Sequence, residues 1–155
     1  MAGYFKTSYL LRVNDYEFED GGADRDKYLI VLNTNEDETY IVHCLTTSNN
    51  RFNLKTPVYG CNDSRGTSYW VFPAKQSIGS MNYSFEKDTY VFFLNNIRKC
   101  PTSKFDLHIS RGYFGIVHLD ILPPDIFKKL LSCIIKSGMA PEAIEDELIF
   151  LKGTL

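Results

Sequence analysis

The sequence lacks a hydrophobic run long enough to cross a membrane. Its most apolar stretches, residues 28–32 and 126–135, are shorter than the roughly 20 residues that a membrane helix needs, and the second carries lysines. Residues 1–9 lack the basic start and the apolar stretch of a signal peptide. These two absences predict a protein that does not enter a membrane and works in the cytoplasm.

Closely spaced cysteine pairs are also missing. The four cysteines, Cys44, Cys61, Cys100 and Cys133, lie far apart in the sequence. Zinc ligands usually come in close pairs, and a disulfide framework belongs to an oxidising compartment that nothing else in the sequence indicates. We therefore expect four buried free thiols, no metal site and no cofactor.

The chain carries little net charge, −2 in total, but the charge is unevenly distributed. Residues 1–50 hold four basic and nine acidic side chains, whereas residues 51–111 hold nine basic and four acidic ones. A basic central segment that gathers on one face would attract phosphate. The alternative is that these charges are scattered over solvated strands and loops, and the overall pI of about 5.9 favours that alternative.

Aromatic residues, by contrast, are plentiful, with ten Tyr and eleven Phe. Together with many Val, Ile and Thr they favour strands, because such side chains pack well on a pleated surface. The pattern predicts strands at 4–13, 28–32, 39–45, 69–72, 89–94 and 112–118, with 28–32 buried on both faces. The polar stretches 14–27 and 49–67 are predicted to be loops.

Two helices are predicted at the C-terminal end. Pro124 and Asp125 suit a first helical turn, an apolar stripe follows at three- and four-residue spacing, and Gly138 suits a C-cap. A second helix is expected from residue 141 to 152, with Gly153 as its stop. The predicted fold is mainly β with α, a small β-barrel or strongly bent sheet closed by C-terminal helices. It forms one domain, 1–155, with a core at 4–137 and a helical extension at 138–155.

The order of several short motifs resembles that of the PemK/MazF family of toxin-like endoribonucleases. Gly21 and Gly22 precede Arg25 in a polar loop, and the apolar strand 28–32 follows. The next strand ends in Leu-Thr-Thr-Ser at 45–48, and Phe-Glu-Lys-Asp-Thr-Tyr-Val at 85–91 is similar to a recurring strand entry of the family. The chain departs from the family at 26–27, where Asp-Lys stands in place of Arg-Pro. The resemblance implies an SH3-like or PemK-like barrel.

The resemblance also implies an activity, the metal-independent cleavage of single-stranded RNA. In that reaction the ribose 2′-OH attacks the neighbouring phosphate, so cations and hydrogen-bond donors must face the phosphoryl oxygens. The implied catalytic residues are Arg25, Thr47 and Ser48. The implied substrate-binding residues are Lys27, Thr46 and Arg98. The implied assembly is a homodimer that a small antitoxin protein inhibits.

Other readings of the same residues remain open. Arg25 could equally be a solvated charge in a surface loop. The turn at residues 46–48 could simply end a hairpin. Of the histidines, His43, His108 and His118, each alone is expected to be structural, and His118 with Asp120 is the strongest acid–base candidate. Tyr69, Trp70, Phe72 and Tyr83 are candidates for base stacking, with core packing as the default. The alternative function is a non-catalytic small-barrel module that binds a protein or nucleic acid.

Overall fold

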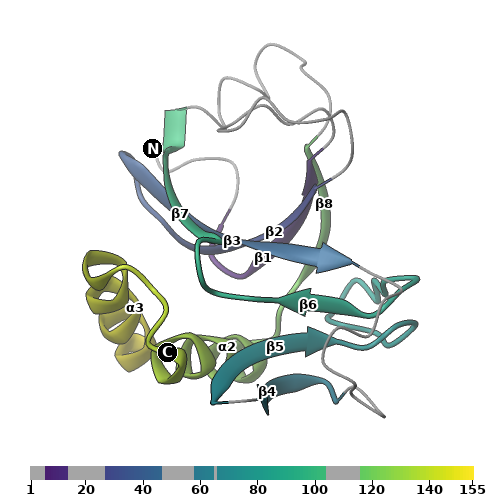
Figure 1. Cartoon of the computed structure of the whole chain (residues 1–155). Coiled ribbons are helices and arrows are strands. Elements are labelled where there is room, and N and C mark those ends of the chain that lie inside the picture. Colours follow the sequence, from purple (N-terminus) through teal and green to yellow (C-terminus); the bar gives the residue numbers. More distant parts are fainter. Residues whose placement is uncertain (1–5, 14–26, 47–57, 65, 104–115) are drawn as a thin grey trace.

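The computed structural model describes residues 6–13, 27–46, 58–64, 66–103 and 116–155. Within these ranges, strands come first and two helices close the chain, which confirms the predicted class (Figure 1). The strands are β1 (Tyr9–Val13), β2 (Lys27–Thr34), β3 (Glu38–Thr46), β4 (Gly60–Ser64), β5 (Thr67–Phe72), β6 (Thr89–Val91), β7 (Ile97–Pro101) and β8 (Ile116–Ile121). The helices are α2 (Pro124–Ser137) and α3 (Glu142–Thr154).

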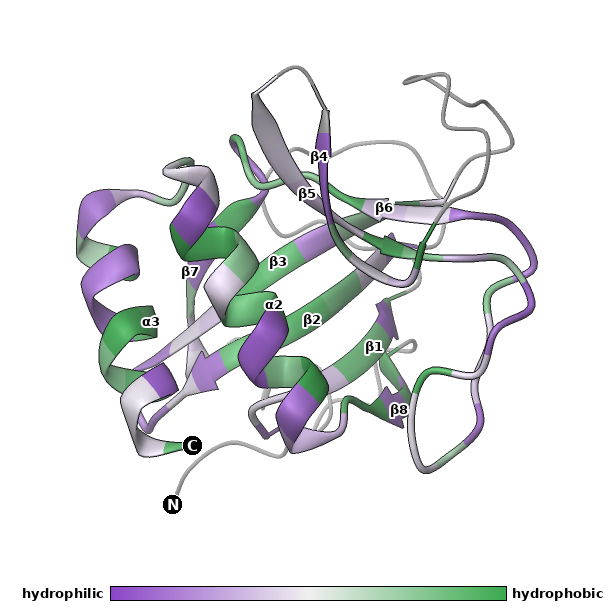
Figure 2. Ribbon diagram, turned by 90° about the horizontal axis from the view of Figure 1, so that it is seen from below, coloured by the Kyte–Doolittle hydropathy of each residue, from purple (hydrophilic) through white to green (hydrophobic). Residues whose placement is uncertain are grey.

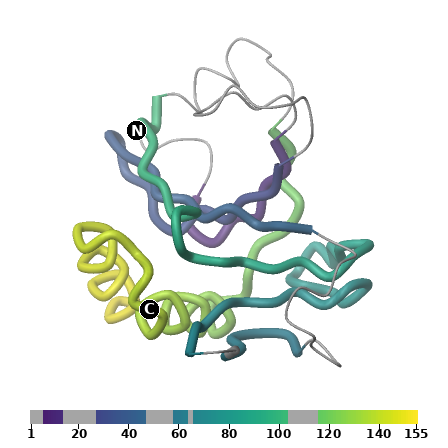
Figure 3. The backbone as a smooth tube through the Cα atoms, in the orientation of Figure 1, coloured from purple at the N-terminus to yellow at the C-terminus, as the bar shows by residue number. Residues whose placement is uncertain are grey.

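The described strands form one antiparallel sheet in the order β4-β5-β6-β3-β2-β1-β8. β3 connects the two halves of this sheet, because it pairs with β7 along residues 38–42 and with β6 at Leu45 and Thr46 (Figure 3). The path has two ends, at β4 and at β8. Among the described residues the sheet is therefore curved and open, and the expected closed barrel is not seen.

The main core lies between the sheet and α2. Figure 2 shows α2 crossing the apolar strands β1, β2 and β3. Leu130, Leu131 and Ile134 of α2 are fully buried there. Alternate residues of β1 to β3 face a second, smaller core on the other side of the sheet. β2 is thus buried on both faces, as its continuous apolar run predicts.

The helices follow the sequence prediction closely. α2 has Pro124 in its first turn and ends at Gly138, which adopts a left-handed conformation with φ of +66°. α3 contributes Ile144 and Leu148 to the main core, so the C-terminal extension is part of that core. The prediction that Gly153 stops α3 is wrong, since the helix continues to Thr154. No helix in the described ranges is long and apolar enough to cross a bilayer.

Two strands were not predicted. β4 lies within the interval 49–67 that was expected to be a loop, because the edge strand Gly-Cys-Asn-Asp-Ser carries no alternating apolar pattern. β7 follows a turn in which Asn95 has a φ of +62°, and that turn ends β6 at Val91 rather than at the predicted residue 94. The first strand starts at Tyr9 instead of residue 4, and the last runs from Ile116 to Ile121.

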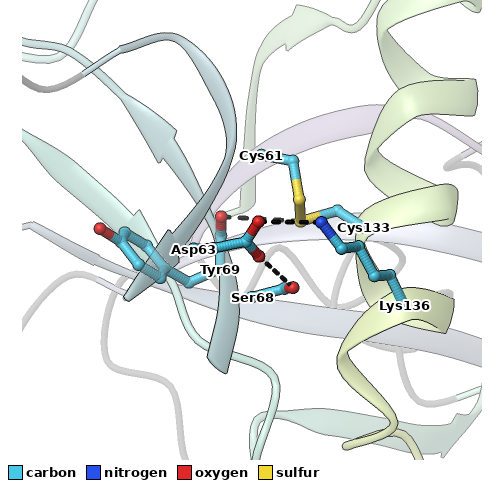
Figure 4. A network of polar contacts seen from close by, with 6 residues as sticks. All are labelled: Cys61, Asp63, Ser68, Tyr69, Cys133 and Lys136. Carbon is cyan, nitrogen blue, oxygen red and sulfur yellow. Dashed lines mark hydrogen bonds and ion pairs between the residues drawn. A yellow bond between two sulfur atoms is a disulfide. The ribbon is translucent and has the colours of Figure 1, made fainter. Parts of the chain in front are cut away.

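The expectation of four free thiols is wrong for two of the cysteines. Cys61 of β4 and Cys133 of α2 form a disulfide across a sequence separation of 72, with their Cα atoms 5.6 Å apart (Figure 4). Sequence spacing gave no sign of this pair, because it depends on the edge strand β4 lying beside α2. Cys44 and Cys100 keep the expected thiol form, and burial raises the pKa of Cys44.

Candidate functional site

The strand register places two of the predicted substrate-binding residues at the same end of the sheet. Lys27, the first residue of β2, lies opposite Val13, the last residue of β1. Tyr28 lies opposite Cys44, so Thr46 at the end of β3 is only one position beyond the residue that faces Lys27. Thr46 also pairs with Thr89, the first residue of β6. We call this edge, formed by Val13, Lys27, Thr46 and Thr89, the Lys27 end of the sheet.

The three predicted catalytic residues, Arg25, Thr47 and Ser48, lie outside the described residues. Their connection to the Lys27 end is covalent. Arg25 precedes Lys27 by two residues, and Thr47 and Ser48 directly follow Thr46. The chain segments that carry the predicted catalytic groups therefore join the sheet at neighbouring strand ends.

Arg98 lies in a different part of the molecule. It is in β7 opposite Ile41, five residues before Thr46 along β3. At the rise of a strand that separation corresponds to about 17 Å. Arg98 is exposed and lines a pocket of about 360 Å³, together with Asn95, Ile97 and residues 139–141 between the two helices. The register does not bring Arg98 together with Lys27 and Thr46.

Arg12 is a second basic residue near the Lys27 end, and no sequence motif indicates it. It lies in β1 opposite Tyr28. Strand alternation places both side chains on the α2 side of the sheet, while Lys27 faces the other side. Arg12 sits among predicted strand residues with no motif around it, so only the register could reveal it. The Lys27 end thus presents a cation on each face.

Tyr83 completes a polar group beside Arg12. It hydrogen-bonds Tyr28, and both rings pack edge-on against Phe85 with centroids 5.1 Å away. Burial, with Tyr28 adding to it, raises the pKa of Tyr83 to about 12, although the nearby Arg12 charge acts in the opposite direction. Tyr83 is therefore a neutral phenol at pH 7. In that state it serves as a hydrogen-bond partner and not as a general base.

A buried carboxylate fixes the loop that carries Tyr83. Asp120 in β8 is fully buried, and its Oδ2 accepts hydrogen bonds from the backbone N–H groups of Gly79 at 2.8 Å and Tyr83 at 3.0 Å. Its Oδ1 accepts from the N–H groups of Met81 at 2.9 Å and Ile121 at 2.7 Å. Three of the four donors, the N–H groups of Gly79, Met81 and Tyr83, lie outside the strands, so the carboxylate satisfies backbone groups of the loop. Asp120 is thus a positioning residue for the loop, and indirectly for Tyr83.

The structure gives His118 and Asp120 separate structural roles, so they are not an acid–base pair. The His118 ring stacks on Tyr9 with centroids 3.9 Å apart, and its Nε2 lies 3.1 Å from the backbone carbonyl oxygen of Asp120. The Asp120 carboxylate is occupied by the loop on the other side of β8. His43 is half-buried in β3 opposite Leu29, and His108 lies outside the described residues.

Most of the aromatic residues considered for base stacking are core residues. Trp70 and Phe72 are buried in the main core beneath α2. Tyr69 is buried on the opposite face of β5, where it packs with Tyr90 and Phe92. Only Tyr83, which is partly exposed, lies beside the Lys27 end.

No group of three or more His, Cys, Asp or Glu side chains in the described ranges is placed to hold a metal ion. Comparison with known proteins identifies no relative: no family model, no curated protein and no solved structure matches the chain. Function must therefore be inferred from the residues themselves and from the strand register that brings Lys27 and Thr46 together.

Proposed function

We propose that the protein is a metal-independent endoribonuclease toxin of the PemK/MazF type, which cleaves single-stranded RNA. The observation that supports this best is the register at the Lys27 end. The segment that contains Arg25 precedes β2 and the segment that contains Thr47 and Ser48 follows β3, and the antiparallel pairing of β2 with β3 brings their points of attachment side by side. The proposed chemistry needs these two segments next to each other.

The proposed reaction is an intramolecular displacement at phosphorus. The 2′-OH of one nucleotide attacks its own 3′-phosphate, the bond to the 5′-oxygen of the next nucleotide breaks, and a cyclic phosphate remains. Negative charge grows on the non-bridging oxygens, where the planar guanidinium of Arg25 would bind with two parallel hydrogen bonds. The hydroxyls of Thr47 and Ser48 would donate to the same phosphate. Lys27 and Thr46 would hold the flanking RNA backbone.

The assembly and the finer fold assignment belong to this proposal too. We infer a PemK-like, SH3-like architecture in which the described sheet and α2 form the framework. We further infer a cytoplasmic homodimer that a small antitoxin protein inhibits. An antitoxin segment with acidic residues would suit the cations at the Lys27 end, because opposite charges favour association.

The experiment that tests the site uses purified protein, long single-stranded RNA and EDTA. We expect discrete cuts with the wild type and none with Arg25→Ala. Lys129→Ala is the matched control, since it removes one exposed positive charge from α2 and should cut normally. Circular dichroism verifies that each variant is folded. Full activity of Arg25→Ala would reject the site, and no cutting by folded wild type would reject the function.

A second candidate is the non-catalytic module that binds a protein partner. Exposed apolar side chains on α3 favour it, because Ile149 is 50% and Phe150 is 72% exposed. Adjacent exposed apolar residues of this kind are typical of contact surfaces. RNA that stays intact, together with retention of a partner that Phe150→Ser abolishes, would support this function instead.

A further inference from the structure

The Cys61–Cys133 disulfide connects an edge strand to a core helix. β4 pairs with β5, and none of its residues belongs to the buried apolar core. Cys61 is exposed, whereas Cys133 is 1% exposed on the inner face of α2. Figure 4 shows the bond spanning the space between β4 and α2. One sulfur therefore belongs to the surface strand and the other to the core.

Besides the disulfide, an ion pair joins β4 to α2, and Ser68 of β5 supports it. Lys136 Nζ donates to Asp63 Oδ2 at 2.8 Å, and Ser68 Oγ donates to Asp63 Oδ1 at 2.6 Å. The Lys136–Asp63 pair is more than half exposed, and such surface pairs contribute little to stability. α2 itself is anchored to the sheet by Leu130, Leu131 and Ile134. Loss of the disulfide would therefore free β4 from α2, while β4 stays paired with β5 and α2 stays on the sheet.

We propose that Cys61–Cys133 is a reversible thiol–disulfide site, which a dithiol reductant opens at the Cys61 sulfur to release β4 from α2. Disulfides of cytoplasmic proteins in mesophiles are generally transient, catalytic or redox-sensing. From the proposed function this inference takes only the cytoplasmic compartment. Exposure decides which sulfur is attacked, because an incoming thiolate reaches Cys61 and not the buried Cys133.

The dithiol reductant supplies the two electrons that this thiol–disulfide exchange needs. Its thiolate bonds to Cys61 Sγ, the disulfide breaks, and Cys133 leaves as a thiolate that takes a proton from water. The second thiolate of the reductant then attacks its own sulfur in the mixed disulfide and releases Cys61, which is also protonated. Two electrons reach the cysteine pair, and the reductant becomes a disulfide. Cys133 Sγ lies 3.6 Å from the carbonyl oxygen of Tyr69, which can accept a hydrogen bond from the new S–H group.

The chain contains a built-in reporter of this reaction. Trp70 is the single tryptophan, and it lies in β5 directly opposite Cys61. Cys133 belongs to the same core cluster as Trp70. A nearby disulfide quenches indole fluorescence, so opening the bond should brighten Trp70.

The test exposes the folded protein to dithiothreitol or to reduced thioredoxin, and follows Trp70 emission, alkylation by mass spectrometry and far-UV circular dichroism. We expect Cys61 to become alkylatable in the folded protein and the emission to rise, with the secondary structure retained, whereas the buried Cys133 thiol should react only after urea is added. Cys61→Ser should emit like the reduced protein and ignore the reductant, while Cys44→Ala should respond like the wild type. These readouts do not involve RNA cleavage, so failure here is distinct from failure of the proposed function.

Two results would overturn the proposal. One is a disulfide that persists in the folded protein under conditions that reduce it in urea. The other is reduction that occurs only together with loss of the circular dichroism signal, which would make the bond a permanent part of the folded structure.

Discussion

The replacement Asp120→Asn tests the most highly connected polar side chain in the described structure. The carboxylate accepts four backbone hydrogen bonds, two on each oxygen, and it is fully buried. Asparagine has nearly the same shape but keeps only one acceptor oxygen. Its amide nitrogen would face two backbone N–H donors, so two hydrogen bonds are lost and like dipoles meet.

The expected loss follows from the hydrogen bonds involved. Bonds to a charged group contribute roughly 1.5–3 kcal/mol each, and partial exposure of the freed N–H groups to water lowers the total. We expect unfolding free energy to fall by about 3 kcal/mol for the two bonds. At roughly 2–4 °C per kcal/mol for a domain of this size, Tm should fall by about 10 °C.

Urea unfolding followed by Trp70 fluorescence measures this change. Asp88→Asn is the matched control, because the Asp88 carboxylate is half-buried and accepts one bond, from the Ala74 N–H at 2.8 Å. It should cost about 1 kcal/mol. Amide hydrogen exchange should accelerate in Asp120→Asn alone, either at Gly79 and Tyr83 or at Met81 and Ile121, according to which oxygen the amide nitrogen replaces. Equal costs for the two replacements, or unchanged exchange at these amides, would refute the role assigned to Asp120.

Three further predictions follow from individual contacts. A Cβ at Gly79 would overlap the carbonyl oxygen of Ile121, so Gly79→Ala should destabilise the protein by more than about 3 kcal/mol in urea unfolding, whereas Gly153→Ala meets open space in α3 and should stabilise it by up to ~1 kcal/mol. The pKa values of Tyr59 and Tyr83 are raised to about 12, first by burial, so the folded state holds their protons more tightly. Their contribution to stability should be complete below pH 10 and be lost towards pH 12, which phenolate absorbance and thermal melts will measure together. The buried Trp70 Nε1 has no hydrogen-bond partner among the described residues, so Trp70→Phe removes no hydrogen bond. We expect the unfolding free energy, measured by circular dichroism, to change by less than about 1 kcal/mol. A loss near the ~3–5 kcal/mol that is typical of truncating an aromatic residue to Ala would contradict this.

The elements that periodicity predicts well are those with buried faces. β2 and α2 are recognisable because a continuous apolar run and a helical stripe directly reflect burial. β4 lacks such a pattern because it is an exposed edge strand, so its sequence predicts a loop. The Cys61–Cys133 disulfide was missed for the same reason, since it depends on where that edge strand packs.

Only some residues of the candidate site can be predicted from the sequence. The sequence motifs pointed to Lys27 and Thr46, and the register places both at one end of the sheet. No motif indicates Arg12, and the sequence indicates Tyr83 only as a candidate for base stacking. Their proximity depends on strand pairing and on the loop that Asp120 holds. Such pairings depend on long-range packing, which local patterns do not encode.

The proposed ribonuclease chemistry depends on one atom of the substrate, the 2′-oxygen at the cut. The most direct measurement is cleavage of a short RNA in EDTA beside the same RNA with a single 2′-deoxy nucleotide on the 5′ side of the cut. We predict that the unmodified RNA yields a cyclic phosphate and a 5′-hydroxyl, and that the 2′-deoxy RNA is not cut at that position. Cleavage of the 2′-deoxy RNA at the same bond, or an intact unmodified RNA, would contradict the account.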